Sequence, residues 1–144
     1  MPNDKIPKKE IINCANNTKD LYDEIKKSRY FKKAEWALIF CIAAAIGFKD
    51  KKYDCFSKPH PGGLFRVSYI EKYTDAIRFI EAIAISHEKS LDILTNEKRI
   101  YEIAECYANG GIKKIYNMVC KNISGANFDK IIEGEINKIR KARL

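Results

Sequence analysis

The chain has 144 residues, of which 46% are hydrophobic and 11% are aromatic. This composition supports one folded domain and argues against an intrinsically disordered chain. The formal net charge of +8 fits a nucleic acid or an acidic protein as a partner, and it fits a lysine-rich surface in water equally well.

Residues 1–12 are polar and contain prolines, so they predict no secretory signal. The cysteines are odd in number and widely spaced, and no pair has CxxC spacing. We therefore expect reduced thiols that serve as small hydrophobic residues in a cytoplasmic protein. The five residues concerned are Cys14, Cys41, Cys55, Cys106 and Cys120.

The domain organisation expected from the sequence is a loose N-terminal arm over residues 1–15 and one helical domain over residues 16–144. Prolines and charges early in the chain favour the loose arm. Thr18 and the two asparagines before it are good helix N-caps, and a narrow apolar stripe follows them. This pattern predicts a short helix that ends near Lys27.

Residues 26–33 (KKSRYFKK) hold five basic residues and no acidic one, with Tyr30 and Phe31 between them. A nucleic-acid contact would use such charges for phosphates and such rings for stacking. A hinge in which Tyr30 and Phe31 pack beneath the next helix explains the segment too, and it is the favoured interpretation. The candidate nucleic-acid-binding residues are Lys26, Lys27, Arg29, Tyr30, Lys32 and Lys33.

An apolar run without any polar residue extends from Trp36 to Ile46. Its alanines favour a helix over a strand, and a helix that is apolar on every side has to be buried. At about 1.5 Å per residue the run is too short for the roughly 30 Å of a bilayer, so we expect no membrane span. We expect Gly47 to end this helix and the Ala43 to Ala45 patch to let another helix approach closely.

The middle of the chain alternates between loops and periodic segments. Prolines and glycines predict a loop over 48–64, and the alternation of residues 65–70 allows one short strand. Because no second strand is evident, we do not expect a sheet. Apolar periodicity predicts a helix over 75–88 and a short helical turn near Leu91 to Leu94.

The clearest amphipathic stretch begins at Thr95 and contains Asn109-Gly110-Gly111. On one straight helix the apolar stripes before and after these residues would face directions roughly 110° apart. Either the helix breaks at the glycines or one helix faces two neighbours, and the break is favoured because Asn-Gly is a good C-cap. A last helix is predicted over 127–142.

The expected fold is therefore all-α (mainly α). It is a single compact bundle of five or six helices around the buried helix 36–47, with one short strand allowed near 65–70.

The sequence offers no convincing reactive cluster. Glu102 and Glu105 lie three residues apart on one helix face and could bridge a cation. The favoured interpretation is that they form a solvent-exposed acidic face of the helix. Neither His60 nor His87 stands in a catalytic motif. We therefore expect no enzymatic activity, no catalytic residues, no cofactor and no metal. A cryptic metal-dependent nuclease remains as a remote alternative.

Three fragments of the chain between residues 40 and 115 resemble a known family. They are FCIAAAIGFKDKK (40–52), AIRFIEAIAISHEKSLDIL (76–94) and IYEIAECYANGGIKKI (100–115). Together they are similar to small accessory proteins encoded beside DNA phosphorothioation (dnd) genes, over roughly residues 31–118. The YANGG piece is the most specific part of this resemblance.

The resemblance implies a bacterial or archaeal cytosolic accessory protein in DNA modification or anti-phage restriction. It transfers no catalytic residue. Its implied partners are other proteins of that system, and a basic DNA-binding adaptor is the alternative. The chain also allows a homo-oligomer.

Overall fold

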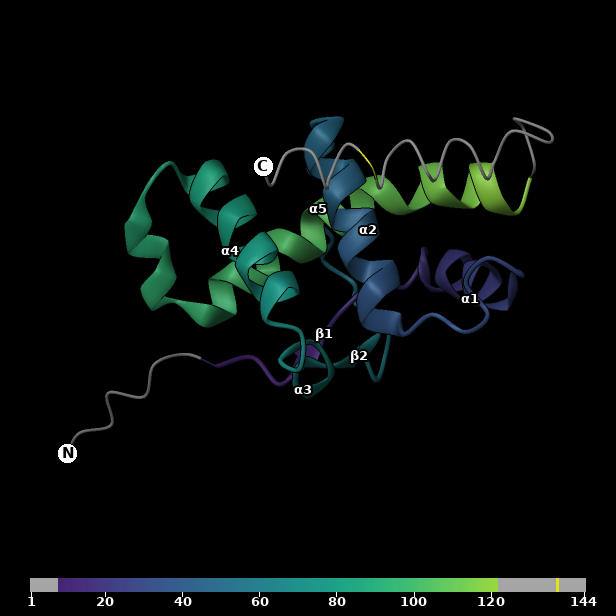
Figure 1. The fold of residues 1–144 in the computed structure, drawn as a ribbon, viewed down its shortest axis with the longest axis horizontal. Coiled ribbons are helices and arrows are strands. Elements are labelled where there is room, and N and C mark those ends of the chain that lie inside the picture. The colour runs from purple at the N-terminus through teal and green to yellow at the C-terminus, as the bar shows by residue number, and fades with distance from the viewer. Residues whose placement is uncertain (1–7, 122–136, 138–144) are drawn as a thin grey trace.

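Helices form where the sequence carries an apolar period of about 3.6 residues, and they account for most of the fold (Figure 1). The computed structural model describes residues 8–121 and residue 137. The elements are β1 (Ile11–Ile12), α1 (Lys19–Lys27), α2 (Trp36–Lys49), β2 (Phe65–Arg66), α3 (Val67–Ile70), α4 (Thr74–Glu88), the 3-10 helix η1 (Leu91–Thr95) and α5 (Glu97–Val119). The predicted mainly helical fold is confirmed.

The central position belongs to α5, whereas the sequence suggested α2. Helix α5 contacts α1, α2, α4 and η1, and it crosses behind α2 in Figure 1. Helix α2 buries one broad face against it, including Phe40, Ala43 and Ala44. On its other side Leu38 is 51% exposed, so α2 is not enclosed on every side as expected.

Glycines make the crossing of α2 and α5 very close. A Cβ atom on Gly47 would lie 1.9 Å from the Tyr107 carbonyl oxygen, and one on Gly111 would lie 2.0 Å from the Ala43 carbonyl oxygen. Two expectations are therefore wrong. Gly47 does not end α2, which continues to Lys49, and the helix does not break at Gly110-Gly111. Close packing, not helix termination, explains these glycines.

The other helical predictions agree with the structure. Helix α1 starts after its N-cap Thr18 and ends at Lys27, α4 ends at Glu88, and η1 supplies the expected short turn. The predicted last helix over 127–142 lies outside the described residues, apart from residue 137.

A small antiparallel sheet fastens the N-terminal segment to the loop before α3. Ile11 pairs with Arg66 and Ile12 pairs with Phe65, so the strand allowed near 65–70 exists but is shorter than that range. Ile12 is fully buried, and the backbone N–H of Leu64 donates to its carbonyl oxygen at 2.8 Å. The expected loose arm over 1–15 therefore does not include residues 11–15, and the expectation that no sheet forms is wrong.

The described helices were also compared with the dimensions of a lipid bilayer. Within this part of the chain, no helix is both long enough and apolar enough to cross one.

Candidate interface at the start of α2

The basic segment 26–33 lies in the connection between α1 and α2. Phe31 is buried, as the hinge interpretation expected, whereas Tyr30 is 38% exposed. The Arg29 guanidinium lies over the Tyr30 ring, 4.9 Å from its centroid, and donates to the Tyr30 hydroxyl at 3.1 Å. Lys26 donates to the carbonyl oxygen of Lys32 at 3.0 Å. The segment is thus a structured turn with exposed cations.

A cavity of about 490 Å³ is lined by part of this segment and by residues from another part of the chain. Lys26 and Lys33 come from the predicted set, and Arg66 joins them from β2. Aromatic rings complete the lining, because Trp36 opens α2 and Tyr69 lies in α3. This basic-aromatic cavity is lined by Lys26, Lys33, Ala34, Glu35, Trp36, Ala37, Leu64, Phe65, Arg66 and Tyr69.

The remaining predicted residues, Lys27, Arg29, Tyr30 and Lys32, do not line this cavity. Arg66, Trp36 and Tyr69 were not among the predicted residues. Among them, Arg66 carries a sequence signal, because it lies between the buried residues Phe65 and Val67 in FRVSYI. Tyr69 is 51% exposed, and the Lys72 Nζ lies over its ring, 5.3 Å from the ring centroid.

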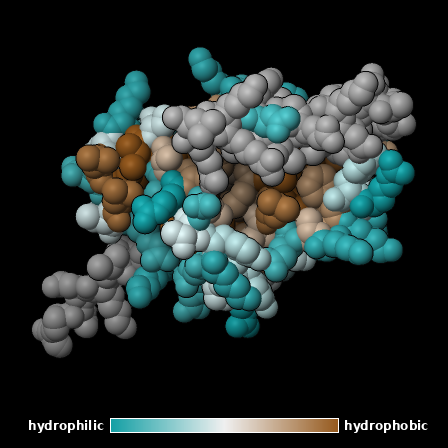
Figure 2. Space-filling model, in the orientation of Figure 1, coloured by the Kyte–Doolittle hydropathy of each residue, from teal (hydrophilic) through white to brown (hydrophobic). Residues whose placement is uncertain are grey.

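A second cavity of about 480 Å³ adjoins the first one and is mainly apolar. The two share residues 33–35 and Ala37, and Glu35 on their common wall accepts a hydrogen bond from the Tyr73 hydroxyl. Figure 2 shows apolar surface over the first half of α2, where Leu38 is exposed. This apolar cavity is lined by Lys33, Ala34, Glu35, Ala37, Leu38, Cys41, Tyr73, Asp75 and Ala76.

The YANGG region of α5 serves the interior of the protein. Asn109 is buried, accepts a hydrogen bond from the Thr18 hydroxyl at 3.1 Å, and donates to the Asp54 carbonyl oxygen at 2.9 Å. Asp54 also donates its backbone N–H to the Cys106 carbonyl oxygen at 3.0 Å. One asparagine on α5 therefore ties the start of α1 to the loop after α2.

Glu105, one helical turn before Asn109, is also buried. Its carboxylate accepts the Asn13 backbone N–H at 2.7 Å and forms an ion pair with Lys9 at 3.2 Å. The expectation that Glu102 and Glu105 form a solvent-exposed acidic face is wrong for Glu105, which is only 6% exposed. Burial raises the pKa of Glu105 to about 7, although the Asn13 N–H and Lys9 act in the opposite direction.

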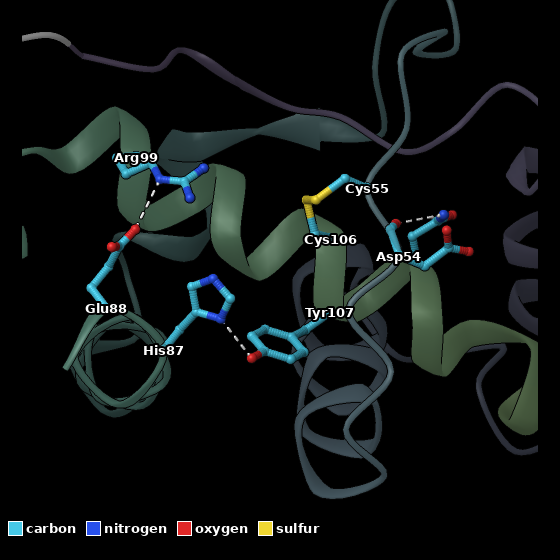
Figure 3. Close-up of a disulfide and its surroundings, with 8 residues drawn as sticks. Asp54, Cys55, His87, Glu88, Arg99, Cys106 and Tyr107 are labelled. Carbon is cyan, nitrogen blue, oxygen red and sulfur yellow. Dashed lines mark hydrogen bonds and ion pairs between the residues drawn. A yellow bond between two sulfur atoms is a disulfide. The ribbon is translucent and has the colours of Figure 1, made fainter.

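The expectation that all cysteines are reduced is also wrong, because Cys55 and Cys106 form a disulfide (Figure 3). This bond joins the loop after α2 to α5. Burial raises the pKa of Cys14 to about 11 and that of Cys41 to about 12, so these two thiols stay protonated and serve as small hydrophobic groups.

An aromatic cluster lies beside the disulfide (Figure 3). The His87 ring stacks on Tyr53 with 4.2 Å between centroids, and its Nδ1 lies 2.7 Å from the Tyr107 hydroxyl. His60 contacts Asn16 through Nδ1 at 3.2 Å. Among the described residues, no group of three or more His, Cys, Asp or Glu side chains is placed to hold a metal ion.

A comparison with protein families identifies one match. The family model described as DNA sulphur modification system-associated protein 4 matches residues 12–135. The match confirms the resemblance noted in the sequence, and it extends beyond residues 31–118 at both ends. No curated protein and no solved structure matches the chain.

Proposed function

Because the chain belongs to the family of DNA sulphur modification system-associated protein 4, we propose that it is a non-enzymatic accessory protein of such a system. It acts through contacts with another protein of that system. The side chains with reactive groups support this proposal, because Glu105 and His87 are engaged in packing and hydrogen bonds within the fold.

The apolar cavity is the observation that carries the protein-contact proposal. Leu38 and Tyr73 are 51% and 43% exposed at its edge, and apolar side chains grouped around a hollow are typical of a protein interface. Lys33 and Asp75 add charges of both signs to the lining. A partner that buries an apolar side chain here would meet polar groups around it.

Leu38→Glu is expected to abolish capture of a co-encoded modification-system protein by the full chain from native cells. A charge in the apolar cavity would have to be desolvated on binding, so capture should fall at least tenfold. The matched control is Ala82→Glu, which adds the same charge at an exposed position on α4. Capture is measured by quantitative mass spectrometry. Equal capture by the two variants would contradict a contact at this cavity.

A second proposed role is direct DNA contact, and the basic-aromatic cavity favours it. Lys26, Lys33 and Arg66 offer cations from two separate segments, while Trp36 and Tyr69 offer rings on which bases could stack. Glu35 is the acidic residue in this lining, and its carboxylate is already occupied by the Tyr73 hydroxyl. This arrangement supports binding of the DNA backbone together with an unstacked base.

DNA binding is expected to weaken steeply between roughly 50 and 200 mM salt. Changing Lys26, Lys33 and Arg66 together to glutamine should lower affinity for duplex, nicked or phosphorothioated DNA at least tenfold at low salt. The control changes Lys58, Lys89 and Lys98, which are exposed and outside both cavities, to glutamine.

Fluorescence anisotropy measures both triple variants. Equal loss in the two would show that only net charge matters. No binding by the unchanged protein at 50 mM salt would refute the DNA role. The same DNA should stay uncut with Mg²⁺, and cleavage by the purified protein would refute the non-enzymatic role.

A further inference from the structure

A third cavity, of about 280 Å³, lies between α4, η1 and the start of α5. Its walls are apolar and come from Ile77, Ile80, Leu94 and Ile100. Three carboxylates surround this apolar lining, from Glu71 after α3, Glu81 in α4 and Glu97 in the first turn of α5. An acidic, apolar-walled cavity stands out in a chain with a net charge of +8.

Tyr101 supplies a second observation at the same place. Its side chain is only 4% exposed, it lines the cavity, and its hydroxyl forms no hydrogen bond with any other described residue. Burial, followed by the charges of the three cavity glutamates, raises its pKa to about 12. Tyr101 therefore lines the same cavity as the three carboxylates, and no other described residue uses the hydrogen-bonding capacity of its hydroxyl.

In the part of the chain that the structure describes, Glu71, Glu81 and Glu97 form no ion pair. Lys8 and Lys9 line a neighbouring cavity that includes Glu71 and Glu97, but Lys9 is paired with Glu105. Carboxylates beside apolar walls gain most from a cation that enters between them.

We propose that this cavity binds a single arginine side chain of a partner protein. The aliphatic stem of the arginine lies on the isoleucines and Leu94, and its guanidinium meets the three carboxylates and the Tyr101 hydroxyl. A guanidinium carries five N–H donors in a planar fork, so it can reach several acceptors at once, whereas an ammonium group is a compact point charge.

The neighbouring surface favours a protein as the source of this cation. Leu91 is 69% exposed and Leu94 is 43% exposed, and Figure 2 shows an apolar patch over η1. Residues that flank an arginine in a partner chain would pack on these leucines, whereas a free polyamine would leave them in water. The cavity shares no lining residue with either cavity at the start of α2, so this inference does not depend on either contact proposed above.

The test is titration calorimetry of the full chain at low salt with the peptide acetyl-Leu-Arg-Leu-amide. The reference peptide carries citrulline, the uncharged analogue of arginine. We expect the arginine peptide to bind at least tenfold more tightly. Glu81→Gln and Tyr101→Phe should each weaken that binding about tenfold, because each removes one partner of the guanidinium. Glu102→Gln, at a neighbouring position of α5 outside the cavity, should leave it unchanged.

Circular dichroism should show that the three variants fold. Binding of the citrulline peptide with equal affinity would overturn the proposal, as would the absence of binding by the arginine peptide at millimolar concentration. Spermidine binding more tightly than the peptide would overturn the protein source, because a small cation alone would then be the better ligand.

Discussion

Gly111→Ala is expected to destabilise the protein by about 3 kcal/mol or more. Helix propensity alone predicts the opposite, since alanine in place of a helical glycine usually stabilises by about 1 kcal/mol. The new Cβ would lie 2.0 Å from the Ala43 carbonyl oxygen and 2.7 Å from the Gly47 nitrogen. These are backbone atoms, so α2 would have to move away from α5 as a whole. Urea unfolding of both proteins measures the difference.

The control for this prediction is Gly62→Ala, which adds the same methyl group in open space. No atom lies within 4 Å of its new Cβ, and its φ of +86° restricts the loss to roughly 1–2 kcal/mol of backbone strain. If Gly111→Ala lowered the free energy of unfolding no more than Gly62→Ala, the close crossing of α2 and α5 would be wrong.

The free energy of unfolding of the unchanged protein should fall as the pH rises from about 4.5 to 7, because Glu105 ionises in the unfolded chain in this range. Glu105→Gln is expected to abolish this fall. The pKa of Glu105 is raised from 4.5 to about 7 by burial, so in this window the folded state keeps a proton that the unfolded chain has released. The stabilisation is therefore fully present below pH 4.5 and is lost as the pH rises through 7. A shift of this size corresponds to about 3 kcal/mol.

Glutamine cannot ionise, so the free energy of unfolding of the variant relative to the unchanged protein should rise by about 3 kcal/mol from pH 4.5 to pH 8. The ion pair with Lys9 forms only when Glu105 is ionised, and its effect is already part of the pKa of about 7, so its loss adds no separate slope. Urea unfolding at a series of pH values measures the difference, and Glu102→Gln is the control on the same helix. A difference that stays flat with pH would mean that Glu105 is ionised in the folded protein throughout.

Local patterns were sufficient for most of the secondary structure. Helices α1, α4 and α5 follow from apolar periodicity. The errors arose where a distant neighbour decides the outcome. Gly47 and Gly111 have the local signature of helix ends, and only the position of the opposite backbone explains why they lie inside helices.

The candidate interface could be predicted only in part for the same reason. The charges of Lys26 and Lys33 are visible in the sequence, but Arg66 joins them because β2 pairs with β1 and α3 folds back beside α2. The bond between Cys55 and Cys106 spans 51 residues, and no spacing motif indicates it. Likewise, the carboxylates around Tyr101 come from three separate elements.

The interlocked backbones of α2 and α5 have a consequence for recognition. Carbonyl groups of each helix fill the space that a side chain would take on the other, so neither helix can slide along its partner without a backbone clash. The cavities at the start of α2 and the cavity lined by Tyr101 are thus held at a fixed spacing. A binding protein that engaged both would meet a rigid template, and its gain in avidity would depend on its own geometry matching that spacing.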